Sequence, residues 1–384
     1  MKGEMPSLSW QFAYLGFCCL FGWNAILNVS RALSANSIYT AQFGQQMATI
    51  YGLTMSVTII PLIFVKSDVI PMNPRAMAGG LLISASLAMI GFSAVTNPGS
   101  AAFGLAMAAL LGIGTAIVQG FFYSEAATYS ANAISMFSIG QSVSGLICLP
   151  IQLGLRQIFE NDMTSTAAFA FLTAGACVLS IPVYMYGVRR TLAVKERTRS
   201  VNQLSVGRRP YSSILREIWP MTLCIFLNNM MLFLVLTNHV NIWNDQSILF
   251  APSSYMLGMI AYFIYNLFDW IGRSLVSFGV KLNRTGVICL TLARLVPLAV
   301  WYVASFGSNS VMKTDYFRLG TLAVFVIMQG LAVTWSFILA PANITIAAEQ
   351  PVVGNVNTLA IVAGIMVGSA LGGVIDGPIQ SLVQ

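Results

Sequence analysis

The whole stretch from Ala76 to Ser124 contains no charged side chain, and several other long runs of the chain share this property. Only 8% of the 384 residues are charged and 57% are hydrophobic, whereas about a quarter of the residues of a soluble globular protein are charged. So few charges cannot cover a water-soluble surface for a chain of this length. The sequence therefore predicts an integral membrane protein.

The uncharged runs are long enough to cross a membrane as helices, which needs about 20 apolar residues each. The segment TNPGS at 96–100 divides the longest run in two, because Pro and Gly interrupt regular structure. A membrane strand would show about ten residues of alternating hydrophobicity, and none of the runs alternates. The sequence predicts an all-α polytopic membrane protein with eleven transmembrane helices, in residues 5–30, 43–65, 76–124 (two helices), 131–155, 164–188, 218–241, 255–280, 285–304, 319–345 and 353–380.

A basic segment, residues 189–217, divides the predicted helices into six and five. The sequence therefore predicts two helical bundles, residues 1–188 and 218–384, joined by this loop on the cytoplasmic side. Such a plan is typical of a rocker-type secondary transporter. The loop itself is interpreted as a determinant of topology that also contacts anionic membrane lipids.

The distribution of Lys and Arg predicts the orientation of the chain in the membrane. If the N-terminus is cytoplasmic, thirteen of the 19 Lys and Arg residues face the cytoplasm and four face the outside. Basic residues accumulate in cytoplasmic loops, so we expect a cytoplasmic N-terminus. An odd number of helices then places the C-terminus outside, and we expect the membrane to be the plasma membrane.

Several classes of protein are disfavoured by what the chain lacks. One histidine, His239, and six cysteines without CxxC spacing argue against a metal centre or a disulfide framework. The predicted spans contain no HExxH, no GxSxG and no paired aspartates, so we expect no enzyme activity, no metal and no cofactor. The net charge of +7 is concentrated in one loop, so no nucleic-acid partner is expected, and no obligate protein partner is inferred.

The predicted helix 255–280 carries two opposite charges in its middle. Asp269 and Arg273 are four residues apart, so they share a helix face and are expected to pair. Pairing offsets a cost of about 2.5–3.5 kcal/mol for each charge in a span, and Gly272 would allow another helix to approach closely. Two interpretations remain open: a salt bridge that locks the helix, or a polar group that faces a permeant.

Other polar residues also lie inside predicted spans. Trp23 and Asn24 lie in the middle of the first span, away from the interfacial belt where tryptophan is usual. Gln119 lies in the fourth span, and its amide needs hydrogen-bond partners; the partner is either another helix or the edge of a heterocyclic base. Glu125, near the cytoplasmic end of that span, is expected to reach the interface. Arg294 in the ninth span is expected to have a structural role.

These residues resemble the equilibrative nucleoside transporter family. The stretch LGFCCLFGWNAILN is similar to the first helix of that family, whose hallmark is a Trp-Asn pair. FDWIGR matches the Asp-x-x-Gly-Arg signature of its eighth helix in full, and LARLVPL, AIVQG and the pair Gly140-Gln141 also fit. The resemblance covers nearly the whole chain, and the compact length resembles the protozoan members.

The resemblance implies a fold related to the major facilitator architecture with one helix fewer. It also implies transport of nucleosides, and often of nucleobases, by alternating access. In this reading Gln119 reads the base, and Asp269 and Arg273 engage the ribose. A neutral ion pair, one amide and one aromatic wall suit a nucleoside, which is uncharged, rich in donors and acceptors, and flat on its apolar face.

By the same resemblance Trp23 and Leu20 form a wall of the pocket, and Asn24 and Asn266 are supporting polar groups. The chain departs from larger members in its shorter loops. Thr115 also stands where many relatives have a glycine, which puts base preference in doubt.

One alternative is a proton-coupled transporter for the same solutes. Coupling needs a titratable group in the pathway, for which Asp269, Glu125 and His239 are the candidates. A channel would need a continuous polar lining, whereas the polar residues of the spans are isolated. A nucleotide would need several uncompensated cations, so phosphate carriage is disfavoured.

Overall fold

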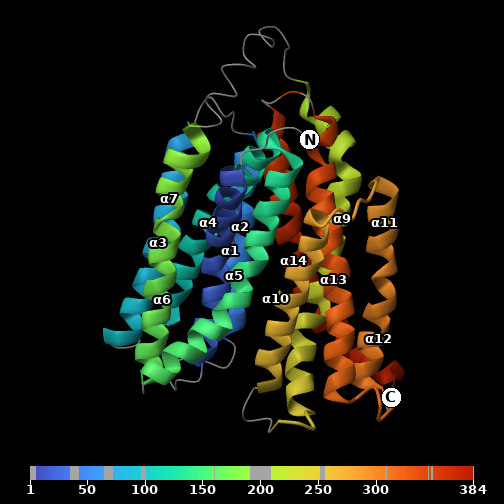
Figure 1. The fold of residues 1–384 in the computed structure, drawn as a ribbon. Coiled ribbons are helices and arrows are strands. Elements are labelled where there is room, and N and C mark those ends of the chain that lie inside the picture. The colour runs from blue at the N-terminus through green and yellow to red at the C-terminus, as the bar shows by residue number, and fades with distance from the viewer. Residues whose placement is uncertain are drawn as a thin grey trace. The chain divides into compact units, whose positions relative to one another are not determined.

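The computed structural model describes residues 6–34, 43–64, 72–96, 101–159, 161–190, 209–250, 256–307, 309–344, 346 and 349–383. All regular secondary structure in these ranges is helical (Figure 1). The prediction of an all-α protein is therefore confirmed for the described part of the chain. Most of the predicted basic loop, residues 191–208, lies outside it.

The first half of the chain forms helices that match the predicted spans in order. They are α1 (Pro6–Ser34), α2 (Phe43–Phe64), α3 (Met72–Thr96), α4 (Ala101–Tyr129), α5 (Ala131–Ile158), α6 (Asp162–Val178), α7 (Ser180–Pro182) and η1 (Val183–Val188).

The second half is also helical, and two of its helices are longer than predicted. It contains α9 (Tyr211–Asp245), α10 (Met256–Ser277), α11 (Arg284–Ala293), α12 (Leu295–Phe306), α13 (Asp315–Leu339), η3 (Pro341–Asn343) and α14 (Gln350–Val383).

Ten stretches among the described helices are long and apolar enough to span a membrane. The predicted span that is not among them is α10, which has 22 residues and carries Asp269 and Arg273. The described residues thus support ten of the eleven predicted spans by length and composition. The eleventh is a helix whose middle is too polar to qualify.

Two predicted spans are interrupted, and proline accounts for both interruptions. Pro182 and Pro297 have no backbone N–H, so neither can donate to the carbonyl four residues earlier in a helix. The α-helices α6 and α11 end at those positions, Val178 and Ala293. The chain continues at once as α7 with η1 and as α12, so each span is completed by a second helical piece.

The described chain forms two compact units, and each is considered by itself. Unit 1 comprises residues 1–217 and 341–359, and unit 2 comprises residues 218–340 and 360–384. The boundaries fall inside α9 and α14 because the first turns of these helices contact the N-terminal helices. Asn355 Nδ2 donates to the Leu62 carbonyl at 2.9 Å, and the glycines Gly120 and Gly354 bring the α4 and α14 backbones together. The predicted division into bundles of residues 1–188 and 218–384 stays a prediction.

Within unit 1, small residues allow the helices to pack closely. A Cβ atom on Gly16 would overlap the Phe137 carbonyl, and one on Gly140 would overlap the Ala13 carbonyl, so the α1 and α5 backbones are in direct contact. Such approach between small residues is how membrane helices gain van der Waals contact without a hydrophobic driving force.

The start of α9 is fixed within unit 1 by one arginine. Arg209 donates from Nη2 to Glu349 Oε2 at 2.7 Å and from Nη1 to Glu217 Oε2 at 3.0 Å. Both carboxylates raise the pKa of Arg209 above its ordinary value, because a neighbouring negative charge favours the cation. The segment before α14 is thereby tied to the segment before α9.

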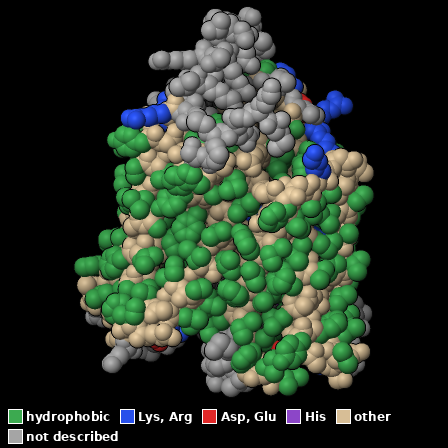
Figure 2. Space-filling model, viewed as in Figure 1, with side chains coloured by type: hydrophobic (Ala, Val, Ile, Leu, Met, Phe, Trp, Pro, Cys, Tyr) green, Lys and Arg blue, Asp and Glu red, His purple; other side chains and the backbone are tan. Residues whose placement is uncertain are grey.

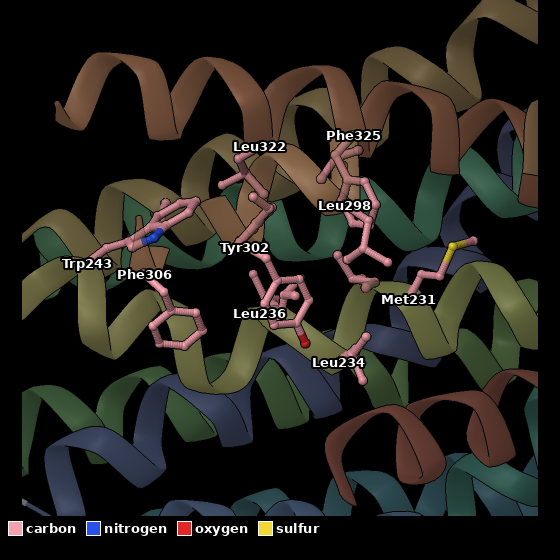
Figure 3. Packing of buried hydrophobic residues seen from close by; sticks show 14 of the residues in the cluster. Met231, Leu234, Leu236, Trp243, Leu298, Tyr302, Phe306, Leu322 and Phe325 are labelled. Atoms are coloured by element: carbon pink, nitrogen blue, oxygen red, sulfur yellow. The ribbon is translucent and has the colours of Figure 1, made fainter. Parts of the chain in front are cut away.

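Unit 2 has an aromatic and aliphatic core built from α9, α10, α12 and α13. Trp243, Trp301, Leu322 and Phe325 are fully buried in it, and Figure 3 shows Trp243, Tyr302, Phe306, Leu322 and Phe325 converging from three of these helices. The indole rings of Trp243 and Trp301 stack with centroids 4.5 Å apart.

The surface of the described helices suits a lipid environment. Hydrophobic side chains cover most of the face shown in Figure 2, and few charged groups interrupt them. Large apolar side chains such as Phe64, Phe278 and Val374 are more than 60% exposed. A water-soluble protein would not leave so many apolar groups uncovered, so the surface agrees with the predicted membrane protein.

Candidate functional site

One face of α4 in unit 1 carries two polar groups deep in the protein. Thr115 and Gln119 are four residues apart, so they lie on the same helix face, and they are 0% and 1% exposed. Within the described part of the chain, the Gln119 Oε1 atom has no hydrogen-bond partner, and the Thr115 hydroxyl lies beside the Tyr51 hydroxyl. A buried acceptor without a partner is costly, so this face is set up to receive a hydrogen-bond donor.

Two stacked aromatic rings lie close to this face. Trp23 of α1 and Tyr51 of α2 are buried, and their rings are 4.2 Å apart at an interplanar angle of 22°. Both helices approach α4 one turn before Thr115. A Cβ atom on Gly22 would meet the Leu111 side chain at 3.0 Å, and one on Gly112 would meet the Tyr51 carbonyl at 2.6 Å. Unit 1 therefore combines an aromatic stack with an unsatisfied polar helix face.

The remaining predicted residues of α1 are half-buried beside this stack. Asn24 donates from Nδ2 to the Ser144 hydroxyl of α5 at 2.8 Å, and that hydroxyl donates in turn to the Gln141 carbonyl oxygen at 2.6 Å. Asn24 thus also ties α1 to α5. Leu20 lies one turn before Asn24 on the same helix and is half-buried.

In unit 2 the predicted ion pair of α10 is present. Arg273 Nε donates to Asp269 Oδ2 at 2.8 Å, and the two side chains are 8% and 2% exposed as whole residues. The i,i+4 spacing places them on one face, and the prediction that they pair is confirmed. Each partner compensates the charge of the other, which lowers the cost of placing the pair in a low-dielectric interior.

The helix that carries the pair is held tightly against α13. A Cβ atom on Gly272 would overlap the Ile327 carbonyl, and one on Gly330 of α13 would overlap the Asp269 carbonyl. The expectation that Gly272 allows close helix approach is confirmed. Asn266, one turn before the pair, donates from Nδ2 to the Tyr262 carbonyl of its own helix at 2.8 Å and is half-buried.

Arg294 lies at the break between α11 and α12 and is completely buried. Its guanidinium donates to the Asn228 carbonyl at 2.9 Å and Oδ1 at 2.6 Å, to the Phe325 carbonyl at 3.2 Å and to Gln329 Oε1 at 2.8 Å. It also lies over the Phe325 ring, 4.0 Å from its centroid. These contacts join α9 and α13, so Arg294 bridges helices.

The structure thus brings the predicted residues together in two groups. Those of unit 1 are on α1 and α4, and those of unit 2 are on α10.

The sequence analysis missed Tyr51. Its only signal in the sequence was a single tyrosine in the middle of an apolar run. The expectation that Glu125 reaches the membrane interface stays a prediction. Within the protein, the Glu125 side chain is buried, at 6% exposed, one turn before the end of α4 at Tyr129.

No group of three or more His, Cys, Asp or Glu side chains that could hold a metal ion occurs among the described residues. The cysteines of this part of the chain are free thiols. The chemistry that the described polar groups offer is hydrogen bonding and stacking.

The sequence matches known transporters. A family model described as nucleoside transporter matches residues 195–376. The Arabidopsis thaliana protein named equilibrative nucleotide transporter 3 is 21% identical to the chain in an alignment of 410 positions, which covers 95% of this chain and 94% of that protein.

Solved structures show which fold the chain shares. The proton:xylose symporter XylE of the major facilitator superfamily, bound to 6-bromo-6-deoxy-D-glucose, superposes with a TM-score of 0.67 at 10% identity, over 98% of this chain and 95% of that one. A POT family transporter in complex with 5-aminolevulinic acid superposes with a TM-score of 0.65 at 12% identity, over 100% and 93%. At such low identity the likeness concerns the fold alone.

The matched family and the structural neighbours are transporters rather than enzymes. The apolar helices agree with a protein that is embedded in a membrane. The fold is that of the major facilitator transporters, and the family model covers the helix with the Asp-x-x-Gly-Arg signature. The chain is a membrane transporter, and its residues 195–376 match the nucleoside transporter family.

Proposed function

We propose that this transporter moves nucleosides, and also nucleobases, across the plasma membrane by facilitated diffusion with alternating access. The observation that carries the proposal is Gln119, a buried amide whose carbonyl oxygen has no hydrogen-bond partner in the described ranges of the chain. Because such an acceptor costs about 1–3 kcal/mol when it stays unpaired, a permeant that donates to it gains that energy on binding.

A nucleobase has the donor that this amide lacks and a flat ring that aromatic side chains favour. The exocyclic amine or ring N–H of a base would donate to Gln119 Oε1. Trp23 would present an aromatic wall to the ring, and its stack on Tyr51 fixes the indole plane. Leu20 would add an apolar wall, and Asn24 would support the polar side of the site.

The sugar would be recognised by the paired charges of α10. Ribose hydroxyl groups both donate and accept, so they match a carboxylate and a guanidinium at once. Asp269 would accept from the ribose hydroxyls and Arg273 would donate to them, while Asn266 would supply a further amide. The formal charge of the pair is zero, so a neutral permeant leaves no charge uncompensated.

The hydrogen-bond partners of the buried arginines disfavour a phosphorylated permeant. Arg294 uses its donors on backbone and amide oxygens, and Arg273 is paired with Asp269. A phosphate group needs several cations or charge-assisted donors that are not already engaged. We therefore propose nucleosides rather than nucleotides as the permeants, although the Arabidopsis relative is named a nucleotide transporter.

The test is uptake by the purified chain in proteoliposomes. Radiolabelled adenosine, inosine, uridine, hypoxanthine and AMP would be offered with and without a pH gradient. We expect saturable, counterflow-stimulated uptake of nucleosides that the gradient does not drive, and no uptake of AMP. Accumulation of nucleoside against its own gradient when the outside is acidic would replace facilitated diffusion with proton symport. AMP uptake without adenosine uptake would overturn the proposed permeant class.

The orientation is a further part of the proposal. A cytoplasmic N-terminus and an extracellular C-terminus follow from the Lys and Arg distribution. A protease added outside intact cells should then leave residues 189–217 uncut, and it should cut them once the cells are permeabilised. Cleavage in intact cells would reverse the orientation.

A further inference from the structure

The only histidine of the chain is enclosed in unit 2 by a hydrogen-bonded cluster. His239 of α9 is 0% exposed, and its ring lies edge-on to Tyr302 and Phe306 of α12, with centroids 4.8 and 5.1 Å away. Nδ1 is 2.8 Å from the Ser305 hydroxyl, and Nε2 is 3.1 Å from Asp376 Oδ1 of α14. Figure 3 labels Tyr302, Phe306 and Trp243, which belong to the same core of unit 2.

The partners of His239 are held in place by further hydrogen bonds. The Ser305 hydroxyl also accepts from Trp243 Nε1 at 2.8 Å and lies 3.0 Å from the Trp301 carbonyl oxygen. The Tyr302 hydroxyl donates to Asp376 Oδ1 at 3.4 Å. Both ring nitrogens of the histidine therefore face oxygen atoms whose positions are already set.

Two protonation states of this cluster, which differ by one proton, fit the observed atom positions equally well. If the Ser305 hydroxyl donates to the Trp301 carbonyl, it must accept from His239 Nδ1–H, because it has only one hydrogen. Nε2 then faces the Asp376 carboxyl group, and a hydrogen bond there needs a second proton on Nε2 or on Oδ1. If the hydroxyl turns to donate to Nδ1 instead, Nε2–H donates to the Asp376 carboxylate, and the cluster holds one proton fewer.

The cluster can thus gain or lose one proton when one hydroxyl group rotates, and no other atom has to move. Burial of the ring disfavours the extra positive charge, and two neighbouring features offset part of this cost. Ser305 lies in the last turn of α12, where the helix dipole favours a cation, and Asp376 supplies a compensating negative charge. The Asp376 side chain is 17% exposed, so the cluster is not fully enclosed at this residue.

Few other charged groups face this cluster among the described side chains. From α12 the titratable neighbour is Tyr302, and from α14 it is Asp376. From α13, Arg318 approaches the ring of Trp243, with Cζ 5.7 Å from its centroid, and it donates to the Ala304 carbonyl beside Ser305. The residues proposed to bind the permeant in unit 2 lie on a different helix, α10.

We propose that His239, Asp376 and Ser305 form a proton-binding site that tunes the transport rate without carrying the proton across the membrane. Protonation changes the net charge of a buried contact among α9, α12 and α14, and so changes the energy with which these helices hold together. Proton binding by this cluster does not depend on which solute the protein carries. Only the predicted effect on the transport rate rests on the proposed function.

The first test uses the fact that the chain has one histidine. Full-length protein labelled with ¹⁵N-histidine gives a single imidazole signal pair, free of overlap. Between about pH 5 and pH 8, the range in which histidine titrates, we expect one protonation step. Asp376→Asn and Ser305→Ala should each displace its midpoint. Ser336→Ala is the matched control, because Ser336 is buried and makes the same back-bond, to the Ala332 carbonyl, but is not among the hydrogen-bond partners of His239.

A ring that keeps one protonation state over this whole range would overturn the proposal. So would a midpoint that Ser305→Ala and Asp376→Asn leave unchanged. Because the wild-type protein alone decides the first point, a variant that fails to fold does not remove the test.

The second test measures adenosine exchange in proteoliposomes with equal pH on both sides. We expect the wild-type rate to change by at least about fivefold across the titration, the lower end of ordinary coupling between two sites. His239→Gln keeps a donor toward Asp376 and does not titrate, so its exchange rate should not change with pH, whereas Ser336→Ala should follow the wild type.

A pH dye in the lumen should show no proton entry with adenosine. Stoichiometric proton entry that His239→Gln abolishes would overturn the regulatory role. If the protein exchanges no nucleoside but His239 still titrates as expected, the proposed function is wrong and the proton-binding site is retained.

Discussion

Gln119 in unit 1 and Arg294 in unit 2 are both buried polar side chains in apolar helices, but their hydrogen bonding differs. Arg294 donates to four oxygen atoms from α9 and α13. Gln119, on the same helix face as Thr115, leaves its Oε1 atom without a partner among the described residues. A saturated group holds helices together, whereas an acceptor left open is a place where a permeant can bind.

The Asp269–Arg273 pair lies between these two cases. Its internal hydrogen bond and close packing against α13 resemble a structural salt bridge. Its position within the stretch that matches the nucleoside transporter family is the reason for proposing a role in binding. The contrast between saturated and open polar groups can therefore be tested by mutation, and the pair is the instructive middle case.

The largest effect should come from Arg294→Leu. This change leaves the amide oxygens of Asn228 and Gln329 without their donor, at about 1–3 kcal/mol for each acceptor left unpaired. We expect little folded protein, measured as yield and as the midpoint of thermal unfolding in detergent. Arg156→Leu is the control, because Arg156 is 39% exposed in its side chain, and it should behave like the wild type. A stable Arg294→Leu protein that fails to transport would move Arg294 into the permeant site.

Removal of one member of the α10 pair should rank next. Asp269→Ala and Arg273→Ala each leave a buried charge without its partner, which costs about 3–5 kcal/mol, so both single variants should be unstable. The double variant has no stranded charge and should regain folding and surface expression. If the pair binds ribose, as we propose, the double variant should reach the membrane and still fail to take up nucleosides. Near-native uptake by the double variant would make the pair purely structural.

Gln119→Ala should have a smaller and more selective effect. The lost hydrogen bond should raise the activation free energy of uptake by about 1–3 kcal/mol, measured as a fall in kcat/KM. The size of this fall should depend on which base is offered. Gln141→Ala is the matched control, since the Gln141 amide oxygen accepts from the Tyr123 hydroxyl at 2.7 Å in the same unit. Its effect should be the same for every nucleoside. A base-independent effect of Gln119→Ala would assign this amide to helix packing.

The smallest effect should come from Tyr51. Tyr51→Leu removes a stacked ring pair worth about 0.5–1.5 kcal/mol, so the KM for nucleosides should rise while unfolding changes little. Tyr51→Phe keeps the ring and should transport normally. Should the two variants behave alike, the stack on Trp23 would have no part in holding the aromatic wall.

Much of this architecture is predictable because it is local or compositional. A span reveals itself by the absence of charge, since burying a charge in lipid is expensive wherever it occurs. The pairing of Asp269 with Arg273 is likewise predictable, because two side chains four residues apart on a helix must be neighbours. Helix ends were less predictable: α9 begins at Tyr211 rather than at 218, since its first turn is stabilised by contacts with distant segments.

The sequence by itself determined that this chain is a helical membrane transporter, and it singled out the charged pair, the amide and the Trp-Asn motif. Only the tertiary structure decided which of these polar groups are saturated. The stack of Trp23 on Tyr51, the enclosure of Arg294 and the bond between His239 and Asp376, 137 residues apart, join separate helices. Hydropathy and spacing describe one helix at a time, whereas a hydrogen bond between helices depends on how their faces meet. The pattern of polar residues therefore predicts where a site is needed, and packing decides which groups remain available to form it.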